Sequence, residues 1–77
     1  MTLPESPLGA PVRVTGIRLP AATALRLNEM GIRLGTLTHV TQVAAFGARV
    51  VAVAGSRYAL DGGTASLIDV EPAQRRA

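Results

Sequence analysis

Residues 26–36, with the sequence R-L-N-E-M-G-I-R-L-G-T, constrain the fold most, because they predict a helix end, a turn and the start of a strand. Apolar side chains three positions apart share one face of the segment before Gly31, which indicates an amphipathic helix. A residue just past a helix often adopts a left-handed conformation that only glycine reaches without strain, so we expect Gly31 to end the helix and Ile32 to fold back onto it. Gly35 makes the next turn, and the β-branched residues after it indicate a strand.

The rest of the chain predicts short strands joined by glycine-containing turns. We expect strands over residues 12–15, 36–43, 49–53, 57–60 and 67–70, a helix over about 20–30, and one helical turn between residues 61 and 66. Short strands with many exposed edges are unstable as a flat sheet, so closure into a small β-barrel is expected. The prediction is therefore one domain over residues 1–77, mainly β with one or two short helices. Its ordered core is expected over about residues 8–71, after an extended lead-in over 3–11 and before a frayed basic tail over 72–77.

Composition and charge argue against several classes of protein. The chain has no cysteine, so neither a disulfide framework nor a thiolate zinc site is expected. Its net charge of +3 comes from arginines spread along the chain, and one Phe and one Tyr offer no platform for single strands, so no nucleic-acid partner is expected. The N-terminus lacks a signal-peptide pattern, and polar residues interrupt the longest stretch without formal charge, residues 34–48. We therefore expect a cytoplasmic protein without membrane insertion.

No catalytic, cofactor or metal site is predicted. His39 is the only histidine, and a transition-metal site normally needs several converging ligands, so His39 is expected to be a partly exposed or edge-strand residue. The acidic residues fall in different elements without paired spacing, and the serines and glycines lack the nucleophile-elbow and phosphate-loop patterns. Glu29 is expected to pair with Arg26 on the helix surface. The sequence therefore does not indicate an enzyme.

Three segments resemble the FeoA family, the small cytosolic accessory proteins of bacterial ferrous iron uptake. The family pattern R-L-x-E-L/M-G-x-x-x-G is similar to residues 26–35, its V-A-P-L-G loop to residues 43–47, and its closing L-R-x-x-E-A-x-x-I-x-V to residues 60–70. The resemblance covers about residues 8–70. Two departures stand out: the loop proline and the Asp-Pro after the loop glycine are replaced by Ala45 and by Ala48-Arg49, and L-R-x-x-E-A is here L-D-G-G-T-A.

The resemblance implies an SH3-like β-barrel and a role in transition-metal transport. It implies that the chain binds and modulates FeoB, the membrane GTPase and permease for ferrous iron, which would recruit it to the inner face of the membrane. The alternative is an SH3-like regulatory or nucleic-acid-binding module, because the same barrel occurs as the C-terminal domain of iron-dependent repressors. The sequence leaves open whether the chain forms a homo-oligomer.

Phe46 is the most informative candidate for a binding site. A large aromatic residue at a hairpin tip flanked by alanines and glycine either folds back as a plug or projects into solvent, and the sequence does not decide between these alternatives. Arginine and aromatic residues are favoured as interface anchors. We therefore predict that Arg26, Met30, Arg33 and Phe46 bind a protein partner, and that Phe46 joins the helix end in one surface if its side chain projects.

Overall fold

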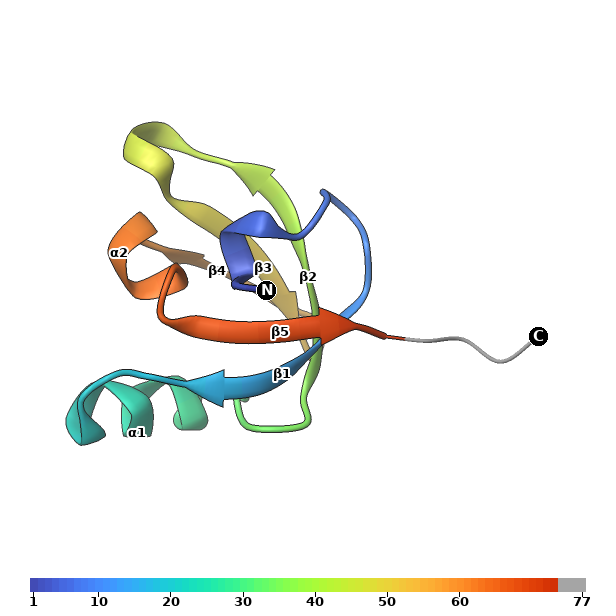
Figure 1. Ribbon diagram of the computed structural model, residues 1–77. Coiled ribbons are helices and arrows are strands. Elements are labelled where there is room, and N and C mark those ends of the chain that lie inside the picture. Colours follow the sequence, from blue (N-terminus) through green and yellow to red (C-terminus); the bar gives the residue numbers. More distant parts are fainter. Residues whose placement is uncertain (74–77) are drawn as a thin grey trace.

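The computed structural model of the chain describes residues 1–73. Most of the expected basic tail, residues 74–77, lies outside the described residues. Figure 1 shows the elements, which are 3₁₀ turns η1 (Leu3–Glu5) and η2 (Ala45–Gly47), helices α1 (Ala21–Glu29) and α2 (Gly62–Ala65), and strands β1 (Val12–Ile17), β2 (Leu37–Val43), β3 (Arg49–Val53), β4 (Ser56–Leu60) and β5 (Ile68–Pro72). The prediction of a mainly β fold with two short helices is confirmed.

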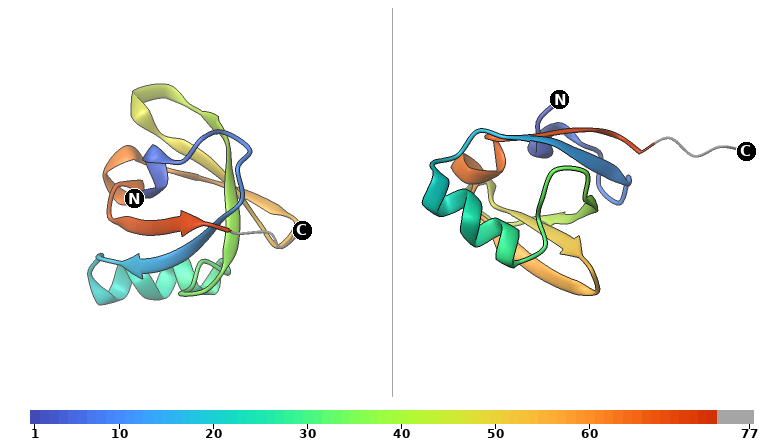
Figure 2. Two further views of the ribbon diagram at one scale, coloured as in Figure 1. Left: turned by 45° about the vertical axis from the view of Figure 1, so that its right-hand side comes forward. Right: turned by 90° about the horizontal axis from the view of Figure 1, so that it is seen from below.

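The five strands form one antiparallel sheet in the order β4-β3-β2-β1-β5. The sheet is strongly bent, so that β1 and β5 face β3 and β4 across the core, and α1 lies along one side of the space between them (Figure 2). Register shifts occur at Thr15 in β1 and at Thr41 in β2, and bulges of this kind increase the local twist of a sheet. Over residues 1–73 no strand pairing joins β4 to β5, so the expected barrel is curved but not closed by hydrogen bonds.

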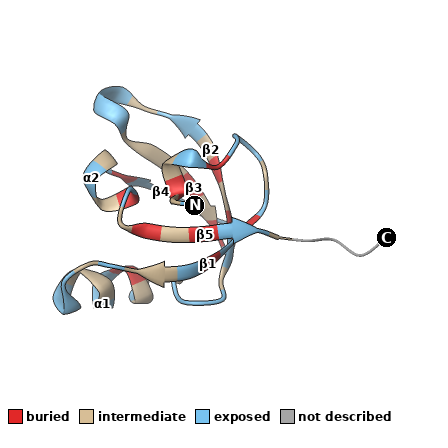
Figure 3. Cartoon of the chain, in the orientation of Figure 1, coloured by how far each residue is buried: buried red, intermediate tan, exposed pale blue. Residues whose placement is uncertain are grey.

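The core lies inside this bend and is built mainly from small β-branched residues. Buried positions alternate with exposed or half-buried ones, as the two-residue period of a strand requires (Figure 3). The largest of the fully buried side chains are Leu3, Val12, Val14, Val40, Val51, Ile68 and Val70. Leu27 of α1 and Ile32 complete the core from the helical side.

The helix end forms as predicted. Gly31 has a φ of +96°, and its N–H donates to the Asn28 carbonyl at 3.0 Å. The N–H of Ile32 donates to the Leu27 carbonyl at 2.9 Å, and Ile32 is 3% exposed. These two bonds form a Schellman motif, in which the backbone reverses and the residue after the glycine covers the apolar face of the helix.

The N-terminus differs from the expected extended lead-in. Leu3 is 2% exposed, and the backbone N–H of Thr2 donates to the Glu5 carboxylate at 2.7 Å. The prolines suggested a segment without a helix, but Pro4 falls in the first turn of η1, where its missing N–H costs no hydrogen bond. Residues 1 and 2 also pair with β5, where the N–H of Val70 donates to the Met1 carbonyl at 2.7 Å. The N-terminal residues thus cover the outer edge of β5.

Candidate functional site

Two of the three predicted binding residues near α1, Met30 and Arg33, have local structural roles. Met30 is half-buried and packs against the core, while Arg26 is exposed. The Nε of Arg33 donates to the Asn28 carbonyl at 3.1 Å, which satisfies a backbone acceptor in the last turn of α1. The expected pairing of Arg26 with Glu29 is wrong, because the one ion pair among residues 1–73 joins other side chains.

Phe46 projects into solvent. Its relative exposure is 102%, and its φ of +58° places a residue with a side chain in the left-handed region. The loop around it is closed by two backbone bonds, from Ala44 N–H to the Ala48 carbonyl at 2.7 Å and from Ala48 N–H to the Ala45 carbonyl at 3.2 Å. Of the two alternatives that the sequence left open, the structure therefore excludes the plug.

The loop is supported from below by α2 and by Arg49. A Cβ atom on Gly62 would lie 3.1 Å from the Gly47 carbonyl oxygen, so the start of α2 touches the backbone of the loop. The guanidinium of Arg49 donates to the same carbonyl. Close packing and hydrogen bonds of this kind restrict the backbone of the tip, so Phe46 is presented on a preorganised support.

The four predicted residues do not form one surface. η2 and the end of α1 lie at opposite ends of the molecule in Figure 1 and in the left view of Figure 2. The seven residues of β2 lie between them, a span of about 20 Å for an extended strand. The distance in space between the two motifs could not be read from their order in the chain. The length of the intervening strand is the physical reason that Phe46 does not join Arg26 and Arg33.

Exposed leucines near the helix end were not singled out from the sequence. Leu34 is 67% exposed and Leu37 is 54% exposed. Leu34 lies in the turn between Gly31 and Gly35. A residue in such a turn has little protein around it to cover its side chain, so this position could have predicted the exposure of Leu34.

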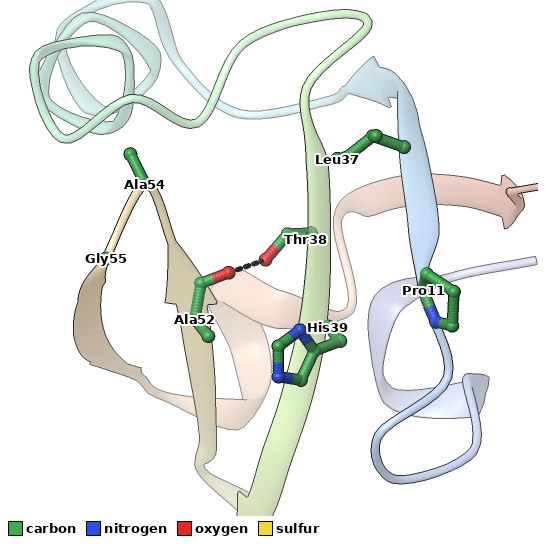
Figure 4. Close-up of a pocket in the computed structure, with 7 residues that line it drawn as sticks. All are labelled: Pro11, Leu37, Thr38, His39, Ala52, Ala54 and Gly55. Carbon is green, nitrogen blue, oxygen red and sulfur yellow. Dashed lines mark hydrogen bonds between the residues drawn. The ribbon is translucent and has the colours of Figure 1, made fainter.

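His39 lies in a shallow hollow on the outer side of the sheet (Figure 4). The hollow has a volume of about 240 Å³ and is lined by Pro11, Leu37, Thr38, His39, Ala52, Ala54 and Gly55. His39 is half-buried, as expected, but it is not on an edge strand, because β2 pairs with both β1 and β3. In the described part of the chain no three His, Cys, Asp or Glu residues come together, so His39 has no neighbours to complete a metal site.

Three of the carboxylates stabilise turns and strand ends. Arg18 donates to Asp69 from Nε at 2.9 Å and from Nη2 at 3.0 Å, and this hydrogen-bonded pair lowers the pKa of Asp69. Thr64 donates to Asp61 through its hydroxyl at 2.6 Å and its backbone N–H at 3.1 Å, which lowers the pKa of Asp61 and caps α2. The backbone and hydroxyl of Thr2 similarly lower the pKa of Glu5. These hydrogen bonds give the three carboxylates structural roles.

The comparisons with known proteins agree with this architecture. The family model described as FeoA domain matches residues 1–72. Iron(II) transport protein A from Clostridium thermocellum is 27% identical with a TM-score of 0.84, over 94% of this chain and 45% of that chain, so this chain spans less than half of that protein. The FeoA of Stenotrophomonas maltophilia, a prokaryotic SH3 domain protein solved in complex with zinc, is 32% identical with a TM-score of 0.77, over 92% of this chain and 89% of that one.

A likeness of fold alone extends to the manganese regulator SloR, which is 16% identical with a TM-score of 0.80 over 95% of this chain and 34% of that one. A comparison with curated proteins yields no match. None of the helices among residues 1–73 has the length and apolar character needed to cross a membrane. Because the family model covers nearly the whole chain and the SH3-like fold is shared, the chain belongs to the FeoA family, whose function is in ferrous iron transport.

Proposed function

We propose that the chain is a cytoplasmic accessory protein that binds and modulates a FeoB-like membrane transporter for ferrous iron. Family membership supports the context of iron transport, and the projecting Phe46 is the observation that supports a binding role. We expect the chain to act by docking rather than by catalysis, since three of its carboxylates, Glu5, Asp61 and Asp69, are held in local hydrogen bonds and an ion pair.

Phe46 has the properties of an interface anchor. An exposed aromatic side chain gains most from entering an apolar socket on a partner, because it loses contact with water over its whole surface. Its support by Gly62 and Arg49 reduces the conformational freedom that must be lost on binding. Docking modulates the transporter only if the two conformations of the transporter bind the tip with unequal affinity.

The variant Phe46→Ala tests this proposal. Because the side chain makes no buried contact, the thermal midpoint of unfolding should stay at the wild-type value, whereas binding to the purified cytoplasmic region of the transporter should weaken by about 1–3 kcal/mol. Leu25→Ala is the matched control, since Leu25 is also exposed, at 59%, but lies on α1 at the other end of the molecule. The control should bind like wild type.

Calorimetric titration and thermal denaturation of the same samples separate the outcomes. If wild type and Phe46→Ala bind the transporter region with equal affinity, Phe46 is not part of the interface. Equal weakening by Phe46→Ala and Leu25→Ala would indicate nonspecific apolar contact, which also contradicts a defined anchor at the tip.

A further inference from the structure

A second exposed apolar surface lies at the end of the molecule opposite the Phe46 tip. It consists of Arg13, Arg33, Leu34 and Leu37, which we call the leucine–arginine patch; all four residues are exposed. Arg13 is opposite Leu37 in the pairing of β1 with β2, and Arg33 precedes Leu34 in the turn after α1. The patch thus combines two exposed leucines with two exposed arginines, a combination that neither the core nor the Phe46 tip explains.

The backbone contacts of the patch hold its turn in place. The Nη1 of Arg13 donates to the Gly35 carbonyl at 3.1 Å, and the backbone N–H of Arg33 donates to the hydroxyl of Thr36 at 3.1 Å. That hydroxyl donates to the Gly31 carbonyl at 3.0 Å. The exposure of Leu34 therefore does not come from a loosely attached loop, and the turn presents Leu34 in a defined position.

The shape and charge of the patch favour a membrane surface over a peptide. Residues 31–36 form the turn at the bottom of Figure 1, where the chain projects outward. The acidic residues nearest along these elements are Glu29 at the end of α1 and Glu71, which is opposite Arg13 in the pairing of β1 with β5, and neither forms an ion pair within residues 1–73. A projecting turn with leucine between cations fits the boundary between lipid headgroups and acyl chains.

We propose that the leucine–arginine patch binds an anionic phospholipid surface, with Leu34 entering the interface and the guanidinium groups of Arg13 and Arg33 contacting lipid phosphates. Guanidinium groups pair well with phosphate oxygens, and long arginine side chains keep their charge at the headgroup level while their stems lie in apolar surroundings. Lipid binding itself does not depend on the proposed function. Its consequence does rest on that function: a chain bound through the patch directs Phe46 away from the bilayer, toward the cytoplasmic region of the transporter.

The first measurement is co-sedimentation of the whole chain with vesicles that contain no transporter. The chain should sediment with phosphatidylglycerol vesicles, should not sediment with phosphatidylcholine vesicles, and should be released by high salt. Arg33→Gln should weaken partition about fivefold, the value for loss of one cation near an anionic surface. Arg57→Gln is the matched control, because it removes the same charge from an exposed position on β4 outside the patch, and it should have a smaller effect.

The second measurement locates the inserted residue. The chain contains no tryptophan, so Leu34→Trp and Phe46→Trp each introduce a single fluorescent reporter at opposite ends of the molecule. With phosphatidylglycerol vesicles, the emission of the Leu34→Trp protein should shift to shorter wavelength and that of the Phe46→Trp protein should not. Circular dichroism of both variants checks that the fold is kept.

Three results would overturn the inference: no sedimentation with anionic vesicles, insertion of the tryptophan at position 46 instead of 34, or equal weakening by Arg33→Gln and Arg57→Gln. A shift of the tryptophan at position 34 only when the transporter's cytoplasmic region is added without vesicles would mean that the patch binds protein. Each of these results leaves the Phe46→Ala binding test unaffected, so failure of the membrane proposal is distinguishable from failure of transporter docking.

Discussion

Replacing Gly31 by alanine should destabilise the fold through two separate effects. The φ of +96° is unfavourable for a residue with a Cβ atom, at a cost of about 1–2 kcal/mol. A Cβ atom at Gly31 would also lie 3.2 Å from Cγ1 of Val53, which is 2% exposed and has little room to move. Overpacking of a core contact adds about 1–3 kcal/mol. The expected total is about 2–5 kcal/mol for Gly31→Ala, a large part of the stability of a domain of this size.

Gly35→Ala is the control that separates the two effects. Gly35 has a φ of +87°, but a Cβ atom there would meet nothing within 4 Å. It should therefore lose only the conformational part, about 1–2 kcal/mol. Urea unfolding followed by circular dichroism measures both variants at the same temperature, and the difference between them is the cost of the contact with Val53.

Equal destabilisation by the two variants would show that Val53 yields without cost, and the packing half of the argument would be refuted. A Gly31→Ala protein as stable as wild type would refute the left-handed helix terminus itself. The left-handed terminus is the structural reason for the glycine in the family motif at residues 26–35, so such a result would leave that glycine without an explanation.

Three further predictions concern the turn, acid and metal. Ala54 has a φ of +50° and Gly55 a φ of +85° in the two-residue turn between β3 and β4, a turn type that Asn-Gly suits. Ala54→Asn should therefore stabilise the fold by about 0.5–1 kcal/mol and raise the thermal midpoint. An unchanged midpoint would contradict this prediction. The pKa of Asp69 is lowered in the fold, so ionised Asp69 stabilises the folded state above the unfolded pKa of about 4, and this stabilisation is lost as the pH falls through the folded pKa. The thermal midpoints of wild type and Arg18→Gln should therefore converge at low pH. A difference that stays constant with pH would argue against the ion pair. Anaerobic calorimetry with Fe²⁺ should show no stoichiometric site on the monomer tighter than micromolar, and a submicromolar site abolished by His39→Ala would disprove this.

Local signals predicted the secondary structure well. The stop at Gly31 depends on the backbone freedom of one residue and on the apolar residue after it, and both are written in adjacent positions. The helical turn expected between residues 61 and 66 likewise depends on neighbours three residues apart, since Asp61 accepts from the backbone N–H of Thr64. Such contacts need no knowledge of the rest of the fold, so the sequence was sufficient.

Contacts between distant segments were not predictable in the same way. The burial of Leu3 depends on residues 1 and 2 pairing with β5, almost the whole length of the chain away. The projection of Phe46 depends on whether any element covers the tip of the β2–β3 hairpin, and its distance from Arg33 depends on the direction of β2. The burial of Leu3 and the position of Phe46 both follow from how the strands are arranged in the sheet. A single sequence does not determine this arrangement when several arrangements would bury the same residues.

The contact between Gly62 and the loop carbonyl of Gly47 lies beside two places where this chain departs from the FeoA pattern, Asp61 before Gly62 and Ala45 in the loop. The pattern has proline where the chain has Ala45, and a proline ring would restrict the loop backbone on its own. Here the restriction comes from a helix fifteen positions later in the sequence, whose glycine allows it to approach the loop closely. A side chain at position 62 should therefore displace the backbone of the tip, although position 62 lies outside the tip itself.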